Sequence, residues 1–303
     1  VVSPVYKAEN CLQELYRRLV DNISLITSDF EIILVEDGGD DNSWAVIKEI
    51  SQNDPRVKGI KFTRNFGVHH AITAGLDISK GDWTIVIECD LQSPPERIKD
   101  LYYKALEGYE VVIARFTRRN ENIFRRFCSR VYWRFMSYLS GMNLDPQHGI
   151  YRIMSKTIVN NFRLFTESDR HLKAIIAWIG GDYAVVDMVR DKRFSGRSAF
   201  TPSKLFRASL IYLVAYSSKP LIIFTVFGLI CSIGAFAVGL IVIVSTLVYG
   251  IDVSGWASIM LSIYFIGGLI ITNLGIIGYY VGKSFDETKK RPIYLIGEQV
   301  NID

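Results

Sequence analysis

The sequence predicts an α/β domain with a mostly parallel sheet, followed by an amphipathic helix and two transmembrane helices. Two observations lead to this prediction. Through the N-terminal part, short β-branched segments alternate with segments of helical apolar periodicity, a pattern typical of a doubly wound sheet. Further on, residues 220–251 and 253–282 contain no Asp, Glu, Lys or Arg, and each run exceeds the roughly 20 apolar residues that span a bilayer.

The alternation can be followed along the chain from its first residue. The first helix is indicated by Leu12, Leu15 and Leu19, which share one helical face, and Asn42 or Ser43 can cap the second. The predicted strands are residues 1–6, 31–35, 57–62, 85–87 and 111–114, with a further strand entered from a loop at 145–152. The predicted helices are residues 12–19, 43–50, 71–78, 156–162 and 174–179.

The strongest chemical signal follows the strand at residues 85–87. Pro94 and Pro95 prevent this strand from continuing, and Glu88 and Asp90 alternate at its end, so both can point to one face. Ligands of open α/β sheets bind just outside the carboxyl ends of the strands. Two carboxylates with Gln92 offer oxygen ligands for Mg²⁺ or Mn²⁺ carrying a nucleotide diphosphate. A solvated strand end with two ordinary acids explains this stretch alone equally well.

A second acidic turn, residues 36–43, follows the strand at 31–35. Because the carboxyl ends of parallel strands meet at one edge, Asp37 and Asp90 can lie together there. The first strand is not followed by a Gly-x-Gly-x-x-Gly fingerprint, and the chain has no Walker-type loop. These absences argue against a dinucleotide oxidoreductase and a P-loop ATPase.

Composition narrows the function further. A net charge of +4 is too mild to indicate a nucleic-acid binder. The four cysteines have no paired spacing, so they predict neither a disulfide framework nor a zinc site, and they suit a reducing, cytosolic compartment. The histidines form no evident ligand constellation, and the adjacent His69 and His70 are interpreted as structural or surface residues.

Basic residues gather in two places before the uncharged runs. The first is a helix-like segment that carries Arg118, Arg119, Arg125, Arg126, Arg130 and Arg134, the last three on one face. It is either a solvated face or a membrane-surface helix that offers arginine to phosphate. The second, residues 190–200, is either a plain linker or a loop that closes over an anion.

The membrane part is predicted as a hairpin of two spans with a short loop near Asp252, since two adjacent uncharged runs disfavour a buried soluble helix. Glycines along both spans would permit close helix contact. Lysine and arginine flank the outer ends, so both chain ends and the large domain are expected on the cytoplasmic side. The expected boundaries are 1–202 for the domain, 203–218 for the amphipathic helix, 219–283 for the hairpin and 284–303 for a cytoplasmic tail.

Taken in order, several motifs resemble glycosyltransferase family 2, and within it the polyprenyl-phosphate hexose synthases such as bactoprenol glucosyltransferases and dolichyl-phosphate mannose synthases. The resemblance covers nearly the whole chain, including the paired spans. The motifs are residues 4–6 (Pro-Val-Tyr), 35–38 (Val-Glu-Asp-Gly), 64–67 (Arg-Asn-Phe-Gly), 74–77 (Ala-Gly-Leu-Asp), 90–96 (Asp-Leu-Gln-Ser-Pro-Pro-Glu) and the tail at 278–282 and 291–294.

The resemblance implies a GT-A fold and an inverting transfer of a hexose from a nucleotide sugar, expected to be a UDP-sugar, to polyprenyl (undecaprenyl) phosphate in the plasma membrane. Mg²⁺ or Mn²⁺ would be held by Glu88, Asp90 and Gln92, with Asp90 essential for catalysis. The nucleotide would be bound by Pro4, Tyr6, Val35, Asp37 and Gly38. Donor and acceptor phosphates would be held by Arg115, Arg125, Ser129, Arg152, Arg193 and Ser198. A homo-oligomer, a tetramer among the options, is also expected.

The chain departs from the family pattern at several positions. Glu88 replaces the first Asp of the metal motif, Glu36 replaces the Asp before Asp37, and Ala8 replaces a frequent acid. Ile150 occupies the position of an Asp proposed as the catalytic base in many bacterial relatives, and Asp145 is a weak substitute. These departures keep two alternatives open, a non-catalytic nucleotide-binding membrane scaffold and a GT-A transferase with another acceptor. The sugar is not named by the sequence.

Overall fold

The computed structural model describes residues 1–117, 131–132, 134, 137–139, 148–168, 170–189, 219–249 and 255–302. The chain divides into two compact units. One unit combines Val1–Arg134, Met142–Thr201 and Arg291–Asp303, and the other combines Phe135–Gly141 and Pro202–Lys290. The first unit therefore contains both ends of the chain, and the second is inserted into it.

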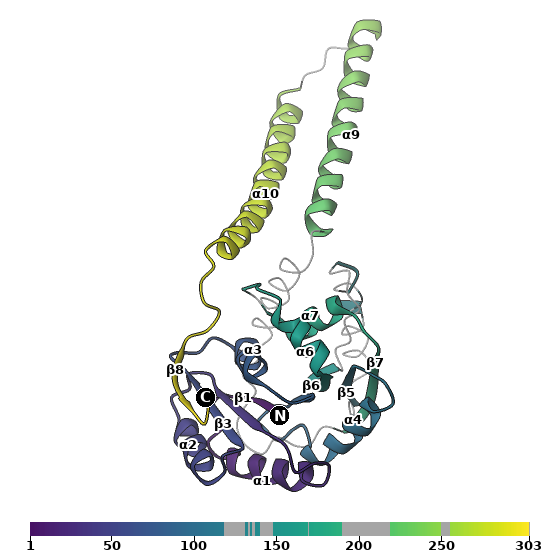
Figure 1. Cartoon of the computed structure of the whole chain (residues 1–303). Helices are drawn as coiled ribbons and strands as arrows, with labels where there is room; N and C mark the ends of the chain where they lie inside the picture. The colour runs from purple at the N-terminus through teal and green to yellow at the C-terminus, as the bar shows by residue number, and fades with distance from the viewer. Residues whose placement is uncertain are drawn as a thin grey trace. The chain divides into compact units, whose positions relative to one another are not determined.

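The first unit is built on an eight-stranded sheet of order β7-β5-β6-β4-β1-β2-β3-β8 (Figure 1). The strands are β1 (Val2–Val5), β2 (Ile32–Glu36), β3 (Val57–Phe62), β4 (Trp83–Val86), β5 (Val111–Thr117), β6 (His148–Ser155), β7 (Tyr183–Val189) and β8 (Ile296–Val300). Strands β1 to β4 are parallel to one another, and β5 is parallel to β7. Strand β6 runs antiparallel to β4 and β5, and β8 runs antiparallel to β3. The predicted mostly parallel sheet is confirmed.

Helices cover both faces of this sheet. They are α1 (Leu12–Ile23), α2 (Ser43–Asn53), α3 (Val68–Ile78), α4 (Ile98–Ala105), α6 (Lys156–Arg163) and α7 (Leu172–Ile179), with the short 3₁₀ helix η1 (Pro95–Arg97). Because strand side chains alternate between faces, Ile32 and Leu34 enter one core while Ile33 and Val35 enter the other. Both cores are closed by helices, as a doubly wound fold requires.

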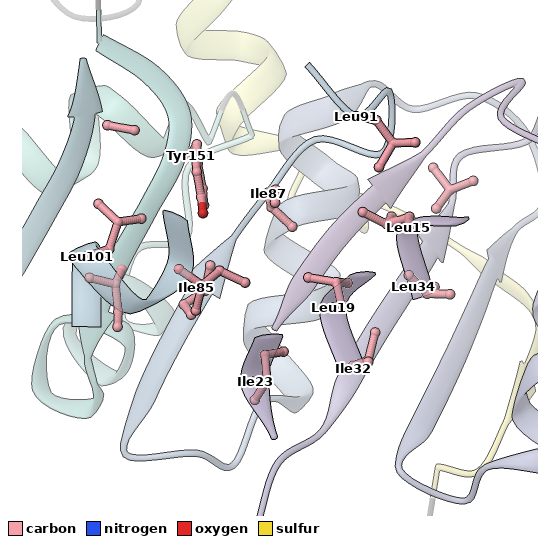
Figure 2. Packing of buried hydrophobic residues seen from close by; sticks show 14 of the residues in the cluster. Leu15, Leu19, Ile23, Ile32, Leu34, Ile85, Ile87, Leu91, Leu101 and Tyr151 are labelled. Carbon is pink, nitrogen blue, oxygen red and sulfur yellow. The ribbon is translucent and has the colours of Figure 1, made fainter. Parts of the chain in front are cut away.

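The first core lies between the sheet and helices α1, α2 and α4. Leu15, Leu19 and Ile23 recur at helical spacing on α1 and are buried against the strands (Figure 2). The second core lies under α3, α6 and α7, where α3 comes very close to β1: a methyl group added at Gly75 would be 2.3 Å from Val2 Cγ1. This close approach explains why a residue without a side chain occurs there.

The second unit contains the two helices α9 (Lys219–Tyr249) and α10 (Trp256–Thr288). Leu221–Ile241 and Ser262–Thr288 are candidate membrane spans, with mean hydropathies of 2.6 and 1.6. The glycines predicted to allow close helix contact have no atom of the described chain within 4 Å of an added Cβ; they are Gly228, Gly234, Gly239, Gly267, Gly268, Gly275 and Gly278. Within the described residues, therefore, these glycines do not mediate the packing of α9 against α10. The predicted amphipathic helix at 203–218 lies outside the described residues.

The structure differs from the sequence-based expectation at the end of β4 and in the C-terminal segment. Strand β4 ends at Val86, although the N–H of Ile87 still donates to the carbonyl of Val2 at 3.0 Å, so Glu88 and Asp90 lie in the turn after the strand. The expected C-terminal tail at 284–303 instead begins within α10 and then forms β8. This strand was missed because its pairing partner, β3, is far away in the sequence.

Candidate active site

The carboxyl edge of the sheet collects the residues that the sequence analysis singled out. Strands β1 to β5 and β7 all end there, and the antiparallel β6 begins there. The turns after β2 and β4, the loop after β3 and the first residues of β6 therefore meet at one edge. In the adjacent β1 and β2, Pro4 and Val35 are buried register partners, and Tyr6 follows β1 with 45% of its surface exposed.

Asp37 is the best-anchored acid at this edge. Its buried carboxylate accepts hydrogen bonds from the backbone N–H groups of Phe66, at 2.7 Å, and Gly67, at 2.9 Å. Burial raises the pKa of Asp37 above its ordinary value of 3.8, although these two N–H groups oppose the shift. The carboxylate thus joins the turn after β2 to the loop after β3, which consists of residues 63–67 and is called the donor loop below.

The turn after β2 is compressed against the donor loop. Gly38 has a φ of +62°, and an added Cβ would lie 2.2 Å from the carbonyl carbon of Arg64, so only glycine fits. Glu36 closes the turn from the other side, since its Oε1 accepts from the N–H of Gly39 at 2.5 Å. Its Oε2 is buried and has no hydrogen-bond partner among the residues that the structure describes, and burial raises the pKa of this carboxyl. Glu36 therefore supports the turn from inside the protein.

The second acidic group is built from the turn after β4. Glu88 accepts a hydrogen bond from Ser93 Oγ at 2.6 Å, and Asp90 Oδ1 accepts from the N–H of Gln92 at 3.1 Å. Leu91 between them has a φ of +58° and is buried, which fixes the tight turn. The arrangement orients two carboxylates at the sheet edge.

Arg152 supplies a buried positive charge behind this turn. Its guanidinium donates to the carbonyls of Gly149, at 2.8 Å, and Ile150, at 3.2 Å. Burial lowers the pKa of Arg152 to about 10, while the nearby charge of Glu88 acts in the opposite direction. A buried cation costs free energy unless it is compensated, so Glu88 balances Arg152 electrostatically.

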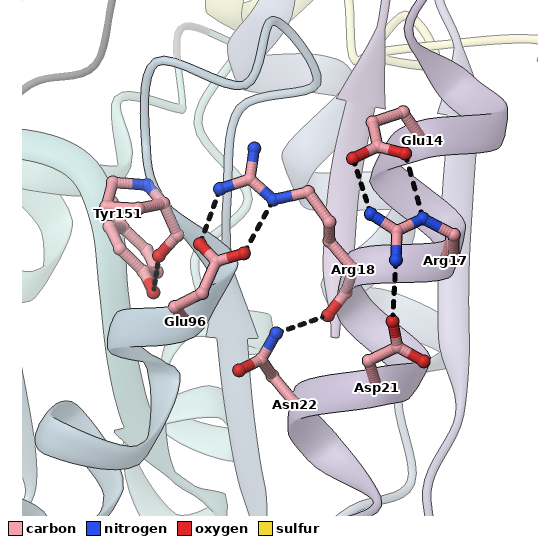
Figure 3. A network of polar contacts seen from close by, with 8 residues as sticks. Glu14, Arg17, Arg18, Asp21, Asn22, Glu96 and Tyr151 are labelled. Carbon is pink, nitrogen blue, oxygen red and sulfur yellow. Dashed lines mark hydrogen bonds and ion pairs between the residues drawn. The ribbon is translucent and has the colours of Figure 1, made fainter.

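Contacts from α1 and β6 fix the segment after the acids. The Arg18 guanidinium pairs with both carboxylate oxygens of Glu96, at 2.7 and 2.5 Å (Figure 3). The buried Tyr151 donates its hydroxyl to the carbonyl of Pro94 at 3.1 Å. Neither contact was predicted, because each joins residues that are distant in the sequence. Together they set where the polypeptide leaves the acidic turn.

The oxygen atoms of Glu88, Asp90 and Gln92 supply only part of the ligands that a hard divalent cation needs. Among the described residues, no group of three or more His, Cys, Asp or Glu side chains forms a metal cage. Two carboxylates are nevertheless the usual protein share of a Mg²⁺ site that takes its other ligands from water and substrate phosphates. Glu88, Asp90 and the neighbouring Gln92 provide this chemistry at the correct edge of the sheet.

Of the remaining predicted phosphate ligands, the structure describes Arg115 but not the others. Arg115 on β5 lies at the edge and pairs with both oxygens of Asp187 on β7, at 2.6 and 2.8 Å, which lowers the pKa of Asp187. Arg125, Ser129, Arg193 and Ser198 lie outside the described residues, and so does Asp145, the weak substitute for a catalytic base. The structure also places His69 against His171, with ring centroids 4.3 Å apart, a contact that the sequence did not indicate.

Comparison with known proteins identifies related chains over the whole length. The model of glycosyl transferase family 2 matches residues 1–167. The uncharacterized glycosyltransferase YkcC of Bacillus subtilis is 33% identical over 304 residues, covering 100% of this chain and 94% of that protein. A prophage bactoprenol glucosyl transferase homolog of Escherichia coli K12 is 34% identical over 297 residues, covering 98% and 97%. The bactoprenol glucosyl transferase of Shigella phage SfV gives the same identity and coverage.

Proposed function

The chain belongs to glycosyltransferase family 2, and from this premise we propose that it transfers a hexose from a nucleotide sugar, a UDP-sugar in the first instance, to polyprenyl phosphate. The observation that carries the proposal is where the membrane unit is inserted. Strand β7 ends at the carboxyl edge, and β8, antiparallel to β3, begins at that same edge. The candidate spans lie between β7 and β8 in the sequence.

This connectivity suits a lipid acceptor. The phosphate of a polyprenyl phosphate lies at the bilayer surface while its tail stays in the hydrocarbon. An enzyme that uses it needs its catalytic edge next to the membrane, and the strands that precede and follow the hairpin in the sequence end and begin at that edge. Relatives named as bactoprenol glucosyl transferases match 98% of the chain, spans included.

For the donor, we assign the nucleotide to Asp37 and Gly38, with Pro4, Tyr6 and Val35 alongside. Support comes from the way the donor loop holds the Asp37 carboxylate at the edge. Glu88, Asp90 and Gln92 would hold Mg²⁺ or Mn²⁺, which would neutralise the charge that develops on the departing nucleoside diphosphate. Asp90 is assigned the central role, because Glu88 also balances the buried Arg152.

For the acceptor, we assign the phosphate to the arginines at the edge. Arg115 stands on β5, and the proposed partners Arg125, Ser129, Arg193 and Ser198 belong to the basic segments. The fully buried Arg152 acts through Glu88 and not by direct phosphate contact. A phosphate monoester has a second pKa near 6, so its oxygen is already anionic at neutral pH. The absence of a carboxylate at Ile150 is therefore tolerable, and positioning by arginine replaces a strong base.

We further propose that the hairpin crosses the membrane twice, with the catalytic domain and both termini in the cytoplasm. Because β8 belongs to the catalytic sheet, the chain must return to the side from which it left, which requires an even number of crossings. Lys283, Lys289, Lys290 and Arg291 at the end of the second span favour the cytoplasmic side. The glycines of the spans, which meet no atom of the described residues, are available for contact with another copy in a homo-oligomer.

The test is a donor panel with the full chain in detergent. The protein is incubated with Mn²⁺ or Mg²⁺, undecaprenyl phosphate and each of several UDP- and GDP-sugars, and lipid-linked sugar is detected by mass spectrometry. One donor should give product. Asp90→Asn should abolish transfer and leave the thermal unfolding midpoint unchanged. Asp40 is an exposed acid paired with Lys7, so Asp40→Asn should retain transfer. Absence of transfer from every donor, with nucleotide still bound, would favour a non-catalytic scaffold.

A further inference from the structure

The segment after α10 is a structural part of the catalytic domain. Residues 291–302, called the C-terminal strap, contain β8, which pairs antiparallel with β3 from Gly59 to Phe62 (Figure 1). At its far end, the Asn301 side chain donates to the carbonyls of Ser51 and Val57, both at 2.8 Å. Midway, Trp44 Nε1 donates to Glu298 at 2.8 Å. These contacts fasten the strap along the outer edge of β3.

The near end of the strap touches the donor loop. The ring of Tyr294 stacks on Phe62, with centroids 5.1 Å apart and an interplanar angle of 17°. Its hydroxyl donates to Asp77 Oδ2 on α3 at 2.9 Å, and the N–H of Thr63 donates to the carbonyl of Leu295 at 3.1 Å. Tyr294 thus joins the last residue of β3 to α3, and these two elements flank the donor loop.

A short series of contacts continues from Tyr294 to Asp37. Phe62, on which Tyr294 stacks, also meets the ring of Phe66 edge-on at 5.5 Å. Phe66 is the residue whose N–H donates to Asp37 at 2.7 Å. Removal of the Tyr294 ring would take away the packing on one face of Phe62. The Phe62 ring, which packs against Phe66, would then be free to move. The backbone donors that hold Asp37 would then be less well fixed.

Burial and the charge of Asp77 raise the pKa of Tyr294, so its hydroxyl remains a hydrogen-bond donor at neutral pH. Asp77 also faces Arg170, whose guanidinium nitrogen lies 3.9 Å from the other carboxylate oxygen. The two oxygens of the Asp77 carboxylate therefore have different partners: Oδ2 accepts from the Tyr294 hydroxyl, and Oδ1 faces Arg170. This geometry ties the strap to the body of the domain at a fixed point near the donor loop.

We propose that the C-terminal strap is a positioning element of the donor site, in which Tyr294 keeps the Phe66 and Gly67 N–H groups on Asp37 and so sets the affinity for the nucleotide. The proposal rests on the proposed role of Asp37 in nucleotide binding. Residues 289–290 connect α10 to the strap in the sequence.

The proposal is tested with three variants of the full chain in detergent. Tyr294→Phe removes the bond to Asp77 and keeps the stack, and Tyr294→Leu removes both. Trp44→Phe is the matched control, because it breaks one hydrogen bond of the same strap away from the donor loop. UDP and GDP are titrated by calorimetry, and amide hydrogen exchange is followed at Phe66 and Gly67. Once the donor is known, KM and kcat are measured separately.

Tyr294→Leu should weaken nucleoside diphosphate binding about tenfold, the change expected when an aromatic pair and one hydrogen bond are lost. Exchange at Phe66 and Gly67 should accelerate, the donor KM should rise, and kcat should stay within about twofold. Tyr294→Phe should give a smaller change of the same kind, and Trp44→Phe should match the wild type. If Tyr294→Leu does not fold, the nucleotide affinity and the amide exchange of Tyr294→Phe alone test the proposal.

Unchanged exchange and unchanged binding in the Tyr294 variants would overturn the proposal. So would an equal loss in Trp44→Phe, since that would indicate a general role in stability. Exchange and nucleotide binding need no acceptor, so they give an answer even where transfer to polyprenyl phosphate fails. Faster exchange with unaltered affinity would show that the strap orders the loop but that Asp37 does not bind the nucleotide, which overturns the proposal as stated.

Discussion

Replacement of Asp37 by Asn should separate the stability of the fold from the affinity for nucleotide. Although the carboxylate accepts bonds from the Phe66 and Gly67 N–H groups, burial raises its pKa above 3.8. A raised carboxyl pKa means that the ionised form is less favourable in the folded than in the unfolded chain, so above the folded pKa this charge costs stability. Asn removes that cost and keeps one acceptor oxygen.

The magnitudes follow from these contacts. The unfolding midpoint of Asp37→Asn should rise or stay within about 2 °C of the wild type, because the lost charge and the weakened N–H contacts offset each other. A hydrogen bond to a charged group contributes about 1.5–3 kcal/mol. If Asp37 binds the nucleotide through its charge, UDP affinity should fall roughly 10- to 150-fold.

Calorimetric titration with UDP and a thermal melt on the same preparation measure both quantities. Asp40→Asn is the matched control, because it makes the same charge change in the same turn on a carboxylate that is 79% exposed and paired with Lys7. Wild-type affinity in Asp37→Asn would refute the assignment of this residue to the nucleotide. A midpoint more than about 5 °C lower would refute the inference that its buried charge is unfavourable.

Two further predictions concern α3. Gly75→Ala should lower the free energy of unfolding by about 1–3 kcal/mol in a denaturant titration, because the new methyl would lie 2.3 Å from Val2 Cγ1; an unchanged midpoint would contradict this packing. Burial and His171 lower the pKa of His69, so the wild type should lose stability as the pH falls below the ordinary value of 6.5, where the unfolded chain gains a proton that the folded state binds poorly. Thermal melts of His69→Gln across this range should show a weaker pH dependence, and an identical slope would exclude His69 as the cause.

The spacing of apolar residues along the chain predicted individual strands and helices of the catalytic domain. Residues 57–62 were predicted as a strand and form β3, and residues 156–162 were predicted as a helix and form most of α6. These elements bury apolar residues at the spacing that the sequence displays. The convergence of Asp37 and the Glu88–Asp90 turn at one edge was also predictable, since it follows from parallel strand direction alone.

What supports the site was not predictable in this way. Ser93 on Glu88 and Tyr151 on Pro94 are matters of side-chain reach across a turn or between distant elements. Several predicted phosphate ligands, Arg125 and Arg193 among them, and the weak base Asp145 lie outside the described residues and stay predictions. The sequence pattern also did not indicate that Arg152, which was predicted to hold a phosphate, is buried with its guanidinium bonded to two backbone carbonyls.

The C-terminal strand shows how the sheet constrains the membrane part. Ile296–Val300 contains Gly, Glu and Gln and lacks a continuous apolar run, so only its pairing with β3 identifies it as a strand. Once it is paired, the segments before and after the hairpin both belong to one domain, which is why the proposed topology has an even number of crossings. The hydropathy of the two helices independently identifies two candidate spans, the smallest even number that satisfies this condition. Strand pairing and hydropathy therefore support the proposed topology from unrelated physical grounds.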